Sequence, residues 1–153
     1  MCNRGVDAVT CGQNASVAQD PTRWSEVIPA YRRRYELAIG GCQDRRRAAD
    51  SLWAWETVRD AAQTGSLPLP VLDALVSDLA GGTDYRVYVG AGPLEDLLRR
   101  HAESYAQAFA ERAGTSALWA EALSGVWLNP AEWTALPEQL QQWVPDPRDA
   151  DVA

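Results

Sequence analysis

A glycine-rich turn runs directly into a strongly patterned helix in Gly90-Ala91-Gly92-Pro93-Leu94-Glu95-Asp96-Leu97-Leu98-Arg99-Arg100-His101. Gly92 can adopt the non-helical conformation of a cap residue. Pro93 suits the first helical position because its φ is already helical and it has no N–H to leave unpaired. Acidic residues in the first turn are favoured by the helix dipole. A structural helix start is therefore predicted at Gly90, Gly92, Pro93, Glu95 and Asp96.

The same turn has to be weighed as an anion site, since free N–H groups at a helix start can hold a phosphate. Glu95 and Asp96 would repel such a ligand, and the turn lacks the Lys-Ser/Thr pair of a phosphate loop. We interpret the glycines as structural.

One face of the helix that follows is apolar. Its residues recur at the three- or four-residue spacing of a buried stripe: Leu94, Leu97, Leu98, His101, Tyr105, Ala108 and Phe109. We expect this helix to run from Pro93 to about Ala113 and to form the centre of the core.

Two short motifs carry a resemblance to a known family. One is GAGPLEDLL at residues 90–98, and the other is Gly125-Val126-Trp127-Leu128-Asn129. Together they resemble a family of small bacterial all-helical proteins known only as a domain of unknown function, over residues 31–136. The resemblance implies an all-α fold. It implies no activity that can be transferred to individual residues.

The composition is that of a globular protein. The 153 residues fit one domain, 46% of them are hydrophobic and 23% are charged. All 14 basic residues are arginine, and the net charge of -7 argues against nonspecific binding to nucleic acid or anionic lipid. No apolar run is long enough to span a membrane, and the chain start lacks the apolar region of a signal peptide. We expect a cytoplasmic protein.

Proline and glycine divide the chain into short helical segments. Residues 83–89 favour a strand by propensity, but a lone strand would have no partner, so we assign them to a helix. The predicted fold is all-α, an irregular antiparallel bundle or short solenoid of about six to eight helices. The predicted divisions are a flexible tail at 1–19, one helical domain at 20–144 and an acidic tail at 145–153.

Seven tryptophans are the oddest feature of the composition. A helix predicted over residues 116–127 is apolar around more than half its circumference, which indicates that it is nearly surrounded. We expect Trp55 and Trp127 in the core. Trp53, Trp133 and Trp143 fall at edges, where either a partner contacts them or the fold itself half-buries them.

Two arginine triplets form the clearest departure from the acidic average: Arg32, Arg33, Arg34, Arg45, Arg46 and Arg47. If the two helices that carry them are antiparallel neighbours, the triplets flank one turn and form a single basic patch. That patch is either a solvated face or a contact for a phosphate or an acidic partner.

No residue set predicts catalysis. His101 is the only histidine and stands in the apolar stripe, so we expect it in the core, bonded to a backbone carbonyl or a tyrosine. The three cysteines have neither a metal-ligand spacing nor an even disulfide number, and we interpret them as free thiols. We expect no catalytic residues, no metal and no cofactor.

The first functional hypothesis is a non-catalytic protein-binding module of the immunity or antitoxin type, which neutralises a partner with a basic surface. Its contacts would come from an acidic C-terminal stretch: Glu132, Glu138, Asp146, Asp149 and Asp151. A second hypothesis is a small-molecule or nucleotide-binding domain with His101 and Tyr105 in the pocket wall. A third is a self-associating subunit of a larger assembly that buries the arginine patch.

Overall fold

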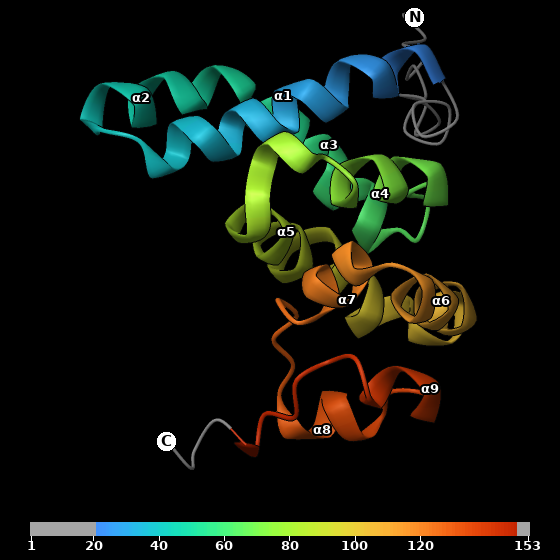
Figure 1. Ribbon diagram of the computed structural model, residues 1–153. Coiled ribbons are helices and arrows are strands. Elements are labelled where there is room, and N and C mark those ends of the chain that lie inside the picture. Colours follow the sequence, from blue (N-terminus) through green and yellow to red (C-terminus); the bar gives the residue numbers. More distant parts are fainter. Residues whose placement is uncertain (1–20, 150–153) are drawn as a thin grey trace, which may run out of the picture.

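The computed structural model describes residues 21–149, which form helices and no strand, as Figure 1 shows. The elements are α1 (Pro21–Ile39), α2 (Cys42–Arg47), η2 (Ala48–Ser51), α3 (Leu52–Gln63), α4 (Leu69–Val76), η3 (Leu79–Gly81), α5 (Gly82–Val89), η4 (Gly90–Leu94), α6 (Glu95–Thr115), α7 (Ala117–Leu123), α8 (Pro130–Thr134) and α9 (Glu138–Gln141). Seven of the α-helices have at least six residues. The predicted all-α class and helix number are confirmed.

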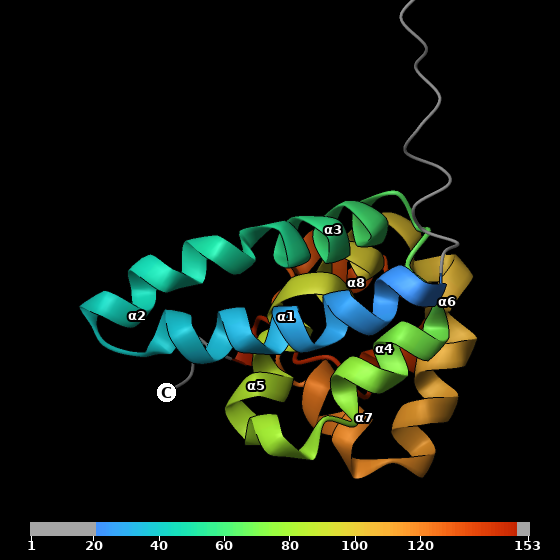
Figure 2. The same ribbon diagram turned by 90° about the horizontal axis from the view of Figure 1, so that it is seen from above.

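A helical hairpin opens the described chain. α1 runs unbroken through Pro29, turns at Gly40 and Gly41, and packs along η2 and α3 on the way back. Figures 1 and 2 both show α2 and the end of α1 projecting beyond the other helices. Ile39, the last residue of α1, is therefore 67% exposed. The cap of α2 is Gly41 and not Asp44, which lies within the first turn.

The chain passes from α5 to α6 through the π-helical turn η4, without an intervening loop. Gly92 has the expected non-helical backbone, with φ -115° and ψ -105°. Regular α-helix begins at Glu95, two residues after the predicted start at Pro93. The assignment of residues 83–89 to a helix is confirmed by α5.

Two glycines let α5 and α7 approach closely. A Cβ atom at Gly90 would overlap the backbone carbonyl of Ala122, and one at Gly125 would overlap the carbonyl of Val87. No side chain fits at either point, so the glycines fix where the two helices cross. A partly buried ion pair between Arg86 and Glu121 also links α5 to α7.

A single apolar cluster extends from α1 to the end of α9. The α6 stripe supplies several of its fully buried side chains, as predicted: Leu94, Leu97, Leu98 and Phe109. Tyrosine rings fill the contact between α1 and α5, with centroids 5.1–6.5 Å apart: Tyr31, Tyr35, Tyr85 and Tyr88. Removal of these apolar side chains from water is the main stabilising contribution in a helical domain.

The prediction for Trp127 is wrong. α7 ends at Leu123, four residues earlier than expected, and Trp127 is 69% exposed. After the Ser124-Gly125 turn the chain leaves the helix, and burial alternates: Val126 and Leu128 point inward while Trp127 points outward. The prediction failed because it assumed helical periodicity up to residue 127, whereas the helix ends at Leu123.

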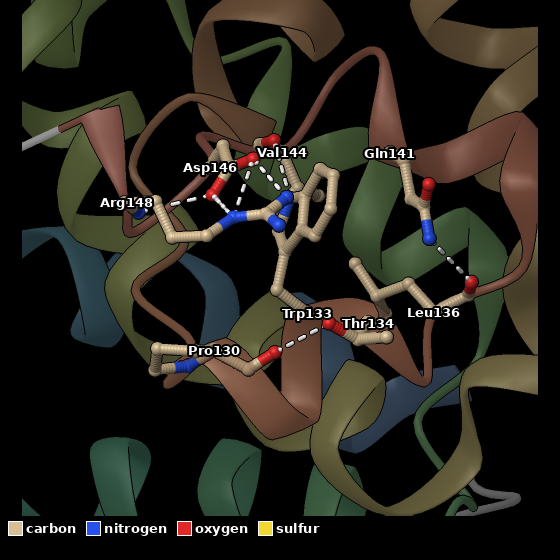
Figure 3. Close-up of polar contacts among 8 residues, drawn as sticks. All are labelled: Pro130, Trp133, Thr134, Leu136, Gln141, Val144, Asp146 and Arg148. Carbon is tan, nitrogen blue, oxygen red and sulfur yellow. Dashed lines mark hydrogen bonds and ion pairs between the residues drawn. The ribbon is translucent and has the colours of Figure 1, made fainter.

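The last two helices lie at the end of the molecule opposite α1 in Figure 1. Asn129 and Glu132 form a capping box at the start of α8, with both hydrogen bonds 2.9 Å long. Residues 145–149 fold back on α8, so this part of the predicted tail is packed: the guanidinium of Arg148 lies 4.9 Å from the Trp133 ring (Figure 3). The predicted tail at 1–19 and the end of the second tail lie outside the described residues.

Candidate functional site

Trp127 is the most exposed of the tryptophans in the described chain. Trp53 is 41% exposed, whereas Trp133 and Trp143 are half-buried and pack against the core. The Trp133 indole N–H donates to the carbonyl of Val144, at 3.1 Å. Of the three tryptophans expected at edges, only Trp53 presents much of its ring to solvent.

The backbone of Trp127 is held from both sides by the first turns of α6. Its N–H donates to Glu95 Oε2 at 2.9 Å, and its carbonyl accepts from Arg99 Nη2 at 3.0 Å. Arg99 is itself held by Glu95 at 2.7 Å and by Glu132 of α8 at 3.4 Å. The indole is thus carried on a fixed backbone, although the segment 126–129 is not helical.

These bonds join the two motifs found in the sequence. Glu95 belongs to the GAGPLEDLL segment, and Trp127 is the tryptophan of the second motif. The close approaches of Gly90 and Gly125 connect the same two segments. Segments more than 30 positions apart in the chain therefore form one structural unit around Trp127.

A cavity lies on each side of Arg99. One, of about 550 Å³, runs between α6 and α8 and includes Arg99, Arg100, His101 and Glu132 in its wall. The other, of about 480 Å³, is lined by residues of α1, α3, α5, η4 and α6. We name the group Glu95, Arg99, Trp127 and Glu132 the Trp127 surface.

The arginine triplets do not form one uniform patch. Arg32 binds Asp78 at 3.1 Å and Glu36 at 3.2 Å, and Arg34 donates to the carbonyl of Ala48 at 2.8 Å. The exposed arginines of the projecting hairpin are Arg33, Arg45, Arg46 and Arg47. The sequence correctly places both triplets beside one turn, but two of the three arginines in the first triplet bind groups within the fold.

His101 and Tyr105 hold a loop and do not share a pocket. His101 Nε2 lies 2.9 Å from the carbonyl oxygen of Gln63 and so carries the proton. The Tyr105 hydroxyl lies 3.0 Å from the carbonyl of Gly65 and 3.2 Å from that of Leu67. His101 lines the cavity between α6 and α8, whereas Tyr105 does not.

Two of the four carboxylates described in the acidic stretch bind groups of this chain. Glu132 caps α8 and binds Arg99, and Asp146 binds Arg148 at 2.8 Å (Figure 3). The Arg148 guanidinium holds the pKa of Asp146 below its usual range. Glu138 and Asp149 are exposed, and Asp151 lies outside the described residues. The stretch offers fewer free carboxylates than the sequence indicates.

Residues 21–149 contain no group of histidine, cysteine and carboxylate side chains placed to hold a metal ion. Cys2 and Cys11 lie outside this part, and the side chain of Cys42 is not described. No helix within the same range has both the length and the apolar character needed to cross a bilayer.

Trp127 is the site residue that sequence reasoning missed. The signal that could have revealed it is Gly125, because a glycine two residues before the tryptophan breaks the helical period. Comparison of the chain with protein-family models, with curated proteins and with solved structures gives no match. The resemblance of the two motifs to a helical family of unknown function thus stays a prediction.

Proposed function

We propose that the protein is a non-catalytic protein-binding module that contacts its partner through the Trp127 surface. The observation that carries this proposal is an indole 69% exposed on a backbone bonded at both its N–H and its carbonyl. A large apolar ring held in water serves no purpose in the packing of this chain.

Tryptophan and arginine are the residue types most enriched at interface hot spots. Because the Trp127 backbone is already fixed by Glu95 and Arg99, binding costs little ordering entropy there. The cavity between α6 and α8, which Arg99 and Glu132 line, can accept side chains of a partner.

The proposed class of module is the immunity or antitoxin type, which acts by covering a site on its partner. The support is the net charge of -7, which steers a protein toward a basic surface. Two carboxylates, Glu95 and Glu132, against one guanidinium, Arg99, make the Trp127 surface itself acidic. We place the contact here and not on the rest of the C-terminal stretch, where Asp146 is paired with Arg148 and no tryptophan is as exposed as Trp127.

The experiment compares Trp127→Ala with Trp53→Ala in binding to the protein that co-purifies from the native host. We expect Trp127→Ala to weaken binding by about tenfold or more, the range of a hot-spot residue. Trp53→Ala, on the far-removed helix α3, is the matched control and should bind as wild type. Equal affinity of wild type and Trp127→Ala would remove the proposal.

Glu95→Ala provides an independent test, because it frees the Trp127 backbone without touching the indole. We expect weaker binding than wild type, together with faster hydrogen exchange of the Trp127 amide, which loses its acceptor. A variant that binds normally would show that the fixed backbone is irrelevant.

A second candidate function is self-association through the projecting hairpin. It is favoured by one observation, the exposure of Ile39 at the hairpin tip beside Arg33 and Arg45 to Arg47. Light scattering of wild type and Ile39→Asp at high protein concentration tests it. A dimer that Ile39→Asp converts to monomer supports it, and a monomeric wild type removes it.

A further inference from the structure

The cavity of about 480 Å³ lies where four helical segments meet. Its wall is formed by Tyr31 of α1, Trp55 and Arg59 of α3, Tyr88 of α5, and the start of α6. Gly92 and Pro93 form its floor, since they belong to the π-helical turn between α5 and α6. It is separate from the indole of Trp127, although Glu95 and Arg99 lie at its rim.

Tyr31 leaves a polar atom unsatisfied at this cavity. The residue is 1% exposed, and its hydroxyl has no hydrogen-bond partner of normal geometry in the described chain. The hydroxyl points toward Gly92, because a Cβ atom added there would lie 3.2 Å from it. A buried hydroxyl without a partner destabilises the fold, and a ligand that bonds to it would remove that cost.

Asp96 supplies a carboxylate at the same end of the cavity. Its side chain makes no ion pair and no hydrogen bond with residues 21–149. Burial raises the pKa of Tyr31 well above its usual range, interactions with Tyr88 and Tyr85 raise it further, and Asp96 adds to the effect. The Tyr31 hydroxyl therefore stays protonated and lies within the electrostatic reach of Asp96.

The arginines at the cavity are already paired. Arg59 interacts with Asp60 at 3.3 Å and lies over the Trp55 ring at 4.6 Å. Arg99 is shared by Glu95 and Glu132. Two arginines and two carboxylates line the wall, and of the two carboxylates only Asp96 has no ion pair within residues 21–149, so a ligand cation can pair with it.

We propose that this cavity binds a small organic cation, a primary amine on an apolar or aromatic body. The ammonium group would pair with Asp96 and donate a hydrogen bond to the Tyr31 hydroxyl oxygen. The apolar body would lie against Trp55, Val58, Tyr88 and Pro93, which form the rest of the wall. Aromatic side chains beside a carboxylate are a favourable environment for an ammonium group.

This inference goes beyond the proposed protein-binding function and does not depend on it. The two experiments separate them, since one measures a protein partner and the other a small amine. A negative result for the amine leaves the proposed protein binding standing, and a negative result for the protein partner leaves the amine site standing.

The test is isothermal titration of the full chain with three probes of nearly one shape. Phenethylamine carries the cation, 2-phenylethanol is its neutral counterpart, and 3-phenylpropionate is the anion. We expect phenethylamine to bind at least tenfold more tightly than the alcohol, and the carboxylate not to bind. Equal binding of all three probes, or none of phenethylamine, overturns the proposal.

Variants locate the binding in the cavity. Asp96→Asn should weaken phenethylamine binding about tenfold or more, and Tyr31→Phe roughly fivefold, from loss of a charged and of a single hydrogen bond. Asp50→Asn removes an exposed carboxylate outside the cavity and is the matched control. Circular dichroism verifies that each variant is folded, and unchanged affinity in folded Asp96→Asn overturns the assignment.

Discussion

At the scale of single residues, Gly90 is critical for helix packing because it has no side chain. Its φ of -60° and ψ of -53° suit any residue, so only the nearby carbonyl of Ala122 excludes a Cβ atom. We expect Gly90→Ala to lower the free energy of unfolding by about 1–3 kcal/mol, the cost of overpacking a core. Urea denaturation measures the change.

Gly114→Ala is the control for this substitution. Gly114 lies within α6, is exposed, and has no atom within 4 Å of an added Cβ. Alanine there should raise the free energy of unfolding by about 0.5–1 kcal/mol, because glycine is the poorer helix former. Equal effects of the two substitutions would show that close approach at Gly90 is unimportant.

Glu121 gives the chain an acid-dependent stability. The bond from the buried guanidinium of Arg86 holds the pKa of Glu121 below its usual value of about 4.5, which the unfolded chain keeps. The unfolded state therefore binds the proton first as the pH falls. The stability from this pair is complete above about pH 4.5 and is lost as the pH falls through the lower, folded pKa.

Glu121→Gln should accordingly be less stable than wild type at neutral pH, and the difference should shrink as the pH is lowered from about 5 to 3. Thermal unfolding of both proteins across this range measures it. A constant difference would mean that the carboxylate charge contributes nothing to the pair.

At the scale of whole elements, local pattern predicted the helices but not where they end. Residues 83–89 have strand propensity yet form α5, because Tyr85 and Val89 become buried against other helices. The capping box of Asn129 and Glu132 is the kind of feature that sequence encodes, because it is a local interaction. Such contacts lie within four residues, where sequence is informative.

The end of α7 was missed because it depends on a distant contact. Gly125 leaves the helix where its backbone meets Val87, 38 positions earlier in the chain. No periodicity within residues 116–127 encodes that meeting. The exposure of Trp127, and with it the centre of the candidate site, could not be predicted from the apolar pattern alone.

The loop between α3 and α4 is held by α6, and this contact is testable. Tyr105→Phe keeps the ring against Phe109 but removes the hydroxyl that bonds the carbonyls of Gly65 and Leu67. We expect a loss of about 0.5–1.5 kcal/mol and faster amide hydrogen exchange in residues 63–67. Thr115→Ala, which removes an exposed hydroxyl at the end of α6, should leave exchange in the loop unchanged.

At the scale of the whole molecule, one apolar cluster includes Trp24 of α1 and Val144 beyond α9. We therefore expect a single cooperative unfolding transition, even though a non-helical segment connects α7 to α8. Far-ultraviolet dichroism and tryptophan fluorescence should give the same midpoint in urea. An earlier transition in fluorescence, which Trp133 and Trp143 would report, would show that the last two helices unfold separately.

The contacts of Gly90 and Gly125 also have an evolutionary consequence. Most positions in a helical domain tolerate drift among residues of similar size, but a site where main chain touches main chain accepts only hydrogen. Any distant homologue that retains this crossing must keep both glycines. They should stand 35 positions apart, or farther where a loop between them carries an insertion. This pair is a signature by which such homologues can be sought when overall identity has faded.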